Sequence, residues 1–138
     1  MSRSEMGRVG AVRILVVDDH RGFRESFVSF LKQIPAVEIA GQAADGQEAE
    51  EMAIKLSPDL VIMEIKMPRC DGVVAARRIK HRRPSVRVIL YSMYDPGVAE
   101  CPALKVDRFI PKQRLCEEIL PELQGKSGEP VSYEDRRK

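Results

Sequence analysis

The sequence predicts an α/β fold in which a doubly wound, five-stranded parallel sheet is flanked by five helices. Short apolar runs, several of them rich in Val and Ile, alternate along the chain with longer segments whose apolar residues recur at helical spacing. Acidic residues, Gly and Pro stand at the boundaries between these segments. This alternation is typical of a parallel sheet that is covered on both faces and connected by right-handed crossovers.

The first strand, Val12–Val17, is an apolar run that ends at an acidic pair, as expected for a strand buried on both faces. In the next segment, His20–Ile34, the apolar residues fall at helical spacing, and Pro35 marks the end of the predicted helix. Val37–Gln42 alternates weakly between apolar and polar residues. It is therefore predicted to be the second strand.

The second helix is expected to begin after Asp45-Gly46 and to end at Ser57-Pro58, because apolar residues repeat on one helical face between these two boundaries. The third strand is Leu60–Ile65, another apolar run, which is followed by a Met-Pro pair. The segment from Gly72 to His81 has a helical pattern and a proline beyond it. It forms the third predicted helix.

Val86–Tyr91 is predicted to be the fourth strand. The segment after it, Asp95–Lys105, contains two prolines and a glycine, all of which are unfavourable inside a helix. We therefore expect the fourth helix to be short or irregular. Asp107–Ile110 forms a brief fifth strand, and the last helix runs to about Gln124.

The composition fits one globular domain, since 43% of the 138 residues are hydrophobic and 32% are charged. We expect a flexible N-terminus at 1–11, a folded domain at 12–124 and a polar C-terminal tail at 125–138. The net charge of +2 gives no overall attraction to nucleic acid. No apolar run is long enough for a membrane span or a signal peptide, so a cytoplasmic location is expected.

Chemically reactive side chains follow the predicted strands at their carboxyl ends. Asp18 and Asp19 close the first strand, Glu64 lies near the end of the third, Ser92 follows the fourth and Lys112 follows the fifth. In a doubly wound sheet the ligand site lies at this edge, near the point where the strand order reverses. Three carboxylates, a hydroxyl and an ammonium group around one crevice suit Mg²⁺ beside a phosphate-like anion.

Five stretches occur in a fixed order between about residues 12 and 124. They are VVDDH, ADGQEA, PDLVIMEIKMP followed by Asp71-Gly72, VILYSMYD, and FIPK. Together they resemble the receiver domain of two-component response regulators, and VVDDHRGFRESF and VILYSMYD are most similar to receivers of LuxR/NarL-type transcription regulators. The resemblance implies a CheY-like, flavodoxin-like fold with strand order 2-1-3-4-5 and a role in phosphorelay signal transduction.

The resemblance also implies a metal site. It makes Asp19 a direct ligand and Asp18 a ligand mainly through water. The backbone carbonyl of Lys66 is a third contributor, and the carboxylate of Glu64 completes the set. The implied cofactor is Mg²⁺, and we expect it to bind weakly because the side chain of Lys66 adds positive charge at the rim.

The remaining site residues are assigned by the same resemblance to phosphoryl binding and switching. Glu64 stands where the family has its phosphate-accepting aspartate. Ser92 matches the hydroxyl residue that bonds a phosphoryl oxygen, and Lys112 matches the lysine that pairs with the phosphoryl group. Phe109 matches the aromatic residue whose rotamer reports the state of the switch.

The glutamate departs from the family pattern. It keeps the charge of aspartate but adds a methylene that moves its oxygens by more than ~1 Å, and such a displacement can lower a rate on the order of 10²-fold. We expect phosphotransfer to Glu64 to be slow or absent. We also expect its carboxylate to pair with Lys112 and to imitate a phosphoryl group only in part, since it carries about −1 in place of roughly −1.5 to −2.

These inferences favour a stand-alone receiver domain, not an enzyme, that acts as a phosphorylation-independent or partly phospho-mimetic protein-protein interaction module. Two alternatives stay open. One is an ordinary phosphorylatable receiver in which Glu64 is an introduced substitution, and the other is a scaffold that does not switch. The sequence has no G-x-G-x-x-G, P-loop or His-rich motif that would favour an enzyme.

The resemblance implies a protein partner, such as a histidine kinase or a downstream effector. The partner is expected to bind the face formed by the fourth helix, the fifth strand and the last helix, which is also a homodimer contact in the family. We expect no direct binding to nucleic acid, because no helix-turn-helix follows Gln124 in this sequence. No membrane contact is expected.

Overall fold

The computed structural model describes residues 11–93 and 106–124. The strands in this part of the chain are β1 (Val12–Val17), β2 (Val37–Ala43), β3 (Leu60–Glu64), β4 (Arg87–Ser92) and β5 (Arg108–Pro111). The helices are α2 (Arg21–Lys32), α3 (Gly46–Leu56), α4 (Gly72–Arg82), the short 3-10 helix η1 (Lys112–Arg114) and α6 (Leu115–Gln124). Each element lies where the sequence pattern predicts it, within a few residues at either end.

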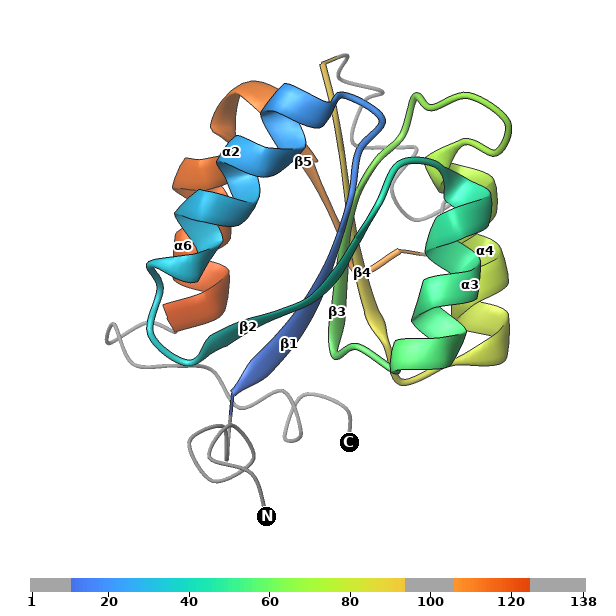
Figure 1. The fold of residues 1–138 in the computed structure, drawn as a ribbon, viewed down its shortest axis with the longest axis horizontal. Coiled ribbons are helices and arrows are strands. Elements are labelled where there is room, and N and C mark those ends of the chain that lie inside the picture. Colours follow the sequence, from blue (N-terminus) through green and yellow to red (C-terminus); the bar gives the residue numbers. More distant parts are fainter. Residues whose placement is uncertain (1–10, 94–105, 125–138) are drawn as a thin grey trace.

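The five strands form one parallel sheet in the order β2-β1-β3-β4-β5. Helices α2 and α6 cover one face of the sheet, and α3 and α4 cover the other (Figure 1). The predicted fold class and strand order are therefore confirmed. All the connections run from the carboxyl end of one strand to the amino end of the next, so the strand ends that carry the reactive residues share one edge.

Four of the five predicted helices lie among the described residues. Among the described residues four α-helices flank the sheet, whereas the sequence predicted five. The segment predicted as a short or irregular fourth helix, Asp95–Lys105, lies outside the described residues, as do 1–10 and the predicted tail at 125–138. None of the helices in the described ranges is long and apolar enough to cross a membrane.

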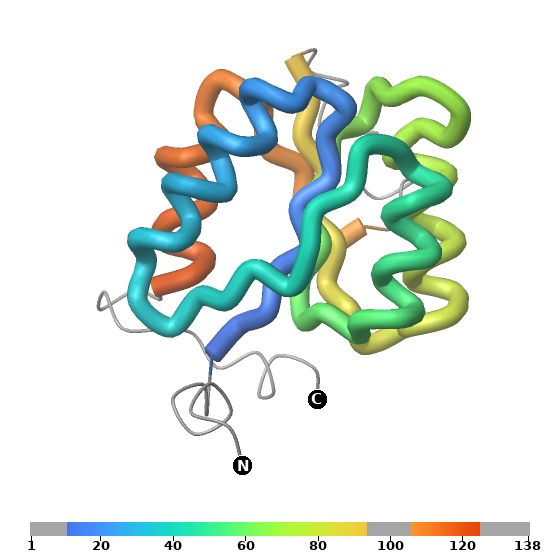
Figure 2. Tube along the Cα trace, viewed as in Figure 1, coloured from blue at the N-terminus to red at the C-terminus, as the bar shows by residue number. Residues whose placement is uncertain are grey.

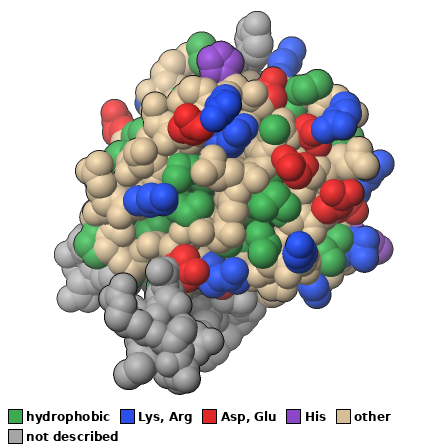
Figure 3. Space-filling view, viewed as in Figure 1, with side chains coloured by type: hydrophobic (Ala, Val, Ile, Leu, Met, Phe, Trp, Pro, Cys, Tyr) green, Lys and Arg blue, Asp and Glu red, His purple; other side chains and the backbone are tan. Residues whose placement is uncertain are grey.

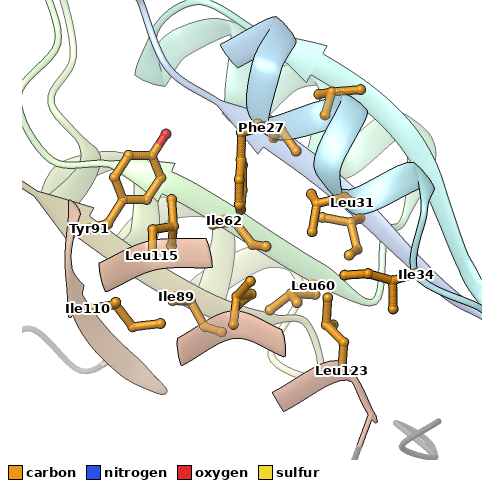
Figure 4. Close-up of a cluster of buried hydrophobic side chains, with 14 of the residues drawn as sticks. Phe27, Leu31, Ile34, Leu60, Ile62, Ile89, Tyr91, Ile110, Leu115 and Leu123 are labelled. Atoms are coloured by element: carbon orange, nitrogen blue, oxygen red, sulfur yellow. The ribbon is translucent and has the colours of Figure 1, made fainter. Parts of the chain in front are cut away.

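Two hydrophobic cores lie on opposite faces of the sheet, because successive residues of a strand point to opposite sides. Ile14 and Val16 face the core under α2 and α6, which we call the α2/α6 core. Figure 4 shows other residues of this core, among them Phe27, Leu31 and Ile62. Leu15 and Val17, their neighbours in the same strand, face the core under α3 and α4, which we call the α3/α4 core. This two-sided burial explains why β1, β3 and β4 read as continuous apolar runs.

Two glycines allow the loop between β3 and α4 to pack closely against its neighbours. A Cβ atom on Gly72 would lie 2.2 Å from the backbone carbonyl oxygen of Glu64, and one on Gly46 would lie 2.2 Å from that of Cys70. The amide of Gly46 also donates a hydrogen bond to the Cys70 carbonyl (3.0 Å). These contacts fix the loop that leaves β3 directly after Glu64.

Candidate functional site

The reactive residues at the strand ends lie together at the carboxyl edge of the sheet. Asp18 follows β1 directly and is fully buried. Glu64 and Ser92 are the last residues of β3 and β4, and both are buried. Lys112 comes immediately after β5. The chain leaves β1, β3 and β5 at the same end of the sheet (Figure 2), and Lys112 contacts both Asp18 and Glu64 there.

Lys112 is the centre of this group. Its Nζ atom lies 3.2 Å from Oε1 of Glu64 and 3.3 Å from Oδ2 of Asp18. The same ammonium group lies 4.3 Å from the centre of the Phe23 ring, where a cation is attracted to the aromatic face. The predicted ion pair between Glu64 and Lys112 is therefore confirmed, and Lys112 bridges two carboxylates that come from different strands.

The second carboxylate oxygen of Glu64 turns back onto the backbone. Oε2 accepts hydrogen bonds from the amides of Ile65 (2.9 Å) and Lys66 (3.4 Å). Burial raises the pKa of Glu64 above its ordinary value, and the neighbouring ammonium of Lys112 opposes this shift. Both oxygens of the Glu64 carboxylate thus accept contacts from groups of the chain itself.

Asp18 is held from several directions. Oδ1 accepts a hydrogen bond from the amide of His20 (2.8 Å), and Oδ2 accepts one from the hydroxyl of Tyr91 (2.7 Å) in addition to its contact with Lys112. The guanidinium of Arg24 donates to the backbone carbonyl of Asp18 (2.6 Å). Burial raises the pKa of Tyr91 far above its ordinary range, so this hydroxyl stays protonated as a donor.

The other predicted site residues stand at or near the same edge of the sheet. Asp19 is exposed beside the buried Asp18, and Lys66 is exposed at the start of the loop after β3. Phe109, in β5, is partly buried and packs against the α3/α4 core. Ser92 is buried at the end of β4, in the strand next to that of Glu64. The contacts of Lys112 join Asp18 and Glu64 across the site, and the roles of the other four residues stay expectations.

The sequence did not identify three residues of the site. They are Phe23, which faces the ammonium of Lys112, Arg24, which contacts the Asp18 carbonyl, and Tyr91, which donates to the Asp18 carboxylate. A signal existed for Tyr91, because a phenolic hydroxyl inside a strand buried on both faces needs a hydrogen-bond partner. Nothing in the sequence identified which partner it would find.

A divalent cation at this site would compete with the contacts that these side chains already make. Over residues 11–93 and 106–124, no three Asp, Glu, His or Cys side chains are grouped so that they could hold a metal ion. The ammonium of Lys112 lies between the carboxylates of Asp18 and Glu64, and each carboxylate already accepts hydrogen bonds from other groups. A metal would have to displace several of these contacts.

Residues 14–124 match the family described as response regulator receiver domain. The chain belongs to this family. As a receiver domain it is similar to a solved structure, the response regulator domain of Thermotoga maritima CheB, with 30% identity, a TM-score of 0.72 and coverage of 81% of this chain and 92% of that one. A LuxR-family response regulator from Aurantimonas sp. SI85-9A1 has a TM-score of 0.76 at 24% identity, over 93% of this chain and 99% of that one, which shows the fold alone.

Two curated relatives resemble the receiver domain in sequence. A protein-glutamate methylesterase/protein-glutamine glutaminase from Alkalilimnicola ehrlichii is 42% identical over 74% of this chain. The transcriptional regulatory protein DegU from Brevibacillus brevis is 37% identical over 61% of it. The matched regions make up only 27% and 36% of those proteins. What this chain shares with them is the receiver domain of a two-component response regulator.

Proposed function

We propose that this receiver domain works as a protein interaction module whose state does not depend on phosphorylation. The observation that carries the proposal is the ion pair between Glu64 and Lys112, in which the carboxylate at the end of β3 holds the lysine that would otherwise pair with a phosphoryl group. The module has no enzymatic activity of its own in this proposal. The partner would recognise the conformation of the module's surface, and the ion pair between Glu64 and Lys112 would set that conformation.

The geometry of Glu64 supports slow or absent phosphotransfer. In phosphoryl transfer the protein contributes mainly positioning and charge neutralisation, so the attacking oxygen must be free and in line. Here Oε1 is paired with Lys112 and Oε2 accepts two backbone hydrogen bonds. The side chain of Glu64 thus folds back onto the chain, and its oxygens are occupied by these contacts.

The same contacts support partial imitation of a phosphoryl group. The carboxylate of Glu64 contacts the ammonium of Lys112 and the amide of Lys66, as a phosphoryl group would in part. Its charge is about −1, whereas a phosphoryl group carries roughly −1.5 to −2. A ligand shifts a two-state switch only by its differential interaction with the two states. We therefore expect Glu64 to bias the domain toward an active-like surface without fully establishing it.

The other assigned roles follow the family pattern. Ser92 and Phe109 are proposed to couple the site to the partner-binding face, and Asp18, Asp19, Glu64 and the Lys66 carbonyl to form at most a weak Mg²⁺ site. When bound, Mg²⁺ would neutralise negative charge at this edge of the sheet. A cytoplasmic location is part of the same proposal.

The partner is proposed to be a protein, either a histidine kinase or a downstream effector, with a second copy of the chain as another user of the same face. In the described part of the chain this face consists of β5 and α6. Arg108 joins the two elements through ion pairs with Glu118 (2.7 Å) and Glu122 (3.2 Å). On the side of the molecule shown in Figure 3, which has β2 in front, basic and acidic side chains are interspersed.

The deciding experiment is the intact mass of the protein after incubation with Mg²⁺ and acetyl phosphate. The unmodified chain, Glu64→Asp and, as a control without the lysine, Glu64→Asp with Lys112→Met are compared. We expect only Glu64→Asp to gain the mass of a phosphoryl group. A mass gain in the unmodified chain would contradict the proposal, whereas no gain in any of them would favour a scaffold that does not switch.

A further inference from the structure

Tyr91 is a buried phenol whose hydroxyl reaches from one strand of the sheet to the end of another. It lies in β4, is fully buried, and donates to Oδ2 of Asp18 at 2.7 Å; its oxygen also lies 3.4 Å from the carbonyl oxygen of Val17. Figure 4 shows the ring at the edge of the α2/α6 core, with its hydroxyl directed away from Leu115 and Ile110. The hydroxyl therefore points out of the core and into the candidate site.

The packing of the ring fixes the position of this hydroxyl. The Tyr91 ring lies 5.8 Å from the ring of Phe23 and 6.4 Å from the ring of Phe27, measured between centroids. Because protein cores are closely packed, a buried ring cannot change its rotamer without displacing the side chains around it. The hydrogen bond to Asp18 is thus held by the core as well as by its own energy.

A divalent cation would compete with this hydrogen bond. Mg²⁺ requires near-octahedral oxygen ligands at about 2.0–2.1 Å and gives up its own water reluctantly. The hydroxyl proton of Tyr91 and the ammonium of Lys112 both approach Oδ2 of Asp18, and the His20 amide takes Oδ1. The positive ends of these donors already offset the carboxylate charge that a cation would otherwise neutralise.

We propose that Tyr91 is a positioning residue that weakens the binding of a divalent cation at Asp18, as a second determinant of phosphorylation independence besides Glu64. The inference rests on the proposed function and extends it. Glu64 changes the group that would accept phosphate, whereas Tyr91 changes the carboxylate that would help to hold the cation. Restoring aspartate at position 64 then repairs only one of two obstacles.

The test is Mg²⁺ affinity, measured by calorimetry and by the amide resonance of His20, which donates to Asp18 and so reports cation binding at that carboxylate. The comparison is made between Glu64→Asp and Glu64→Asp with Tyr91→Phe, which removes the hydroxyl and keeps the ring. Phe27→Leu in the Glu64→Asp background is the matched control. It disturbs the same ring cluster without touching Asp18.

We expect Tyr91→Phe to tighten Mg²⁺ binding by about 10-fold or more, because a hydrogen bond to a charged group is lost from the competing state. The control should change the affinity by less than about 2-fold at a similar loss of stability. Equal Mg²⁺ affinity with and without the hydroxyl would overturn the inference. Should Tyr91→Phe prove less stable, the His20 amide resonance is compared at a lower temperature at which both variants are folded, which supplies the same comparison.

The Mg²⁺ measurement and the phosphorylation assay test the two proposals independently of each other. Mg²⁺ affinity reports only the role of Tyr91, and a phosphorylated unmodified chain would refute the proposed function without affecting the affinity comparison. In the acetyl phosphate assay, the double variant Glu64→Asp, Tyr91→Phe is expected to gain the phosphoryl mass faster than Glu64→Asp alone. Equal rates together with equal Mg²⁺ affinities would assign the silencing to Glu64 by itself.

Discussion

Asp45 carries a buried charge that stabilises the structure at the opposite side of the carboxyl edge from Lys112. Its side chain caps α3 by accepting the amide of Glu48 (2.9 Å), and it also pairs with the guanidinium of Arg69. The hydrogen bond from the Glu48 amide, together with Arg69, holds the pKa of Asp45 below its ordinary value of 3.8. Asp45 therefore stabilises the folded state more when it is ionised than when it is protonated.

The stability contributed by Asp45 should depend on pH in a defined direction. Because the folded-state pKa is lowered, this contribution is complete above the unfolded-state value of 3.8 and is lost as the pH falls through the folded-state value. Asn caps a helix as well as Asp, so Asp45→Asn isolates the charge and should lower the free energy of unfolding by about 1 kcal/mol near pH 7. Urea unfolding followed by circular dichroism measures the loss.

The loss should shrink below about pH 3.8. Asp71 is the matched control, since it caps α4 by accepting the amide of Val74 (3.0 Å) but is exposed. Asp71→Asn should change stability by no more than about 0.5 kcal/mol at either pH. A loss in Asp45→Asn that is the same at about pH 3 and about pH 7 would contradict the electrostatic explanation.

At the scale of elements, the β3–α4 loop depends on backbone contacts that only glycine allows. A Cβ at Gly72 would meet the carbonyl of Glu64, the residue paired with Lys112, so the packing of α4 and the position of Glu64 are coupled. The contact of Gly46 with Cys70 joins the start of α3 to the same loop. Helices α3 and α4 therefore help to position Glu64, although the described contacts of Lys112 come from other elements.

Alanine at these glycines should be destabilising for a steric reason. Gly46→Ala and Gly72→Ala should each lower the free energy of unfolding by about 1–3 kcal/mol, because backbone atoms must move to admit the Cβ. Gly22→Ala in α2 is the control, since nothing lies within 4 Å of its Cβ position. It should stabilise the protein by about 0.4–1 kcal/mol through the unfolded chain. Thermal unfolding distinguishes the three, and equal shifts for all of them would rule out the steric account.

At the scale of the whole molecule, both cores depend on the same sheet. Strands β1, β3 and β4 each contribute side chains to the α2/α6 core and to the α3/α4 core. If these strands unfold, both cores lose the side chains against which their helices pack. The domain should therefore unfold as one cooperative unit.

This cooperativity can be tested with one truncation in each core. Leu31→Ala on α2 and Ile79→Ala on α4 remove fully buried side chains and should each cost about 2–5 kcal/mol. Both should shift the urea midpoint without changing the slope of the transition. Val74→Ala, at a 37% exposed position on α4, should cost less than about 0.5 kcal/mol. A biphasic transition in either core variant would show that the two faces unfold separately.

Much of the architecture could be predicted because it depends on local pattern. The alternation of apolar runs with helical spacing determines a parallel sheet, and the carboxyl ends of parallel strands meet at one edge. That is why Asp18, Glu64 and Lys112 could be grouped, and why the pairing of Glu64 with Lys112 could be expected, although the two residues are 48 positions apart. The departure of Glu64 from the family pattern was equally readable from the sequence.

The directions of the side chains within the site were decided only by the tertiary structure. Asp18 is buried while Asp19 beside it is exposed, and Phe109 packs against the α3/α4 core. The hydrogen bond from Tyr91 to Asp18 joins residues 73 positions apart and depends on how β1, β3 and β4 align and on how the rings of α2 pack. Sequence alone determined which groups meet at this edge of the sheet. Which oxygen each donor takes depended on packing, because a hydrogen bond is sensitive to a few tenths of an ångström that no sequence pattern specifies.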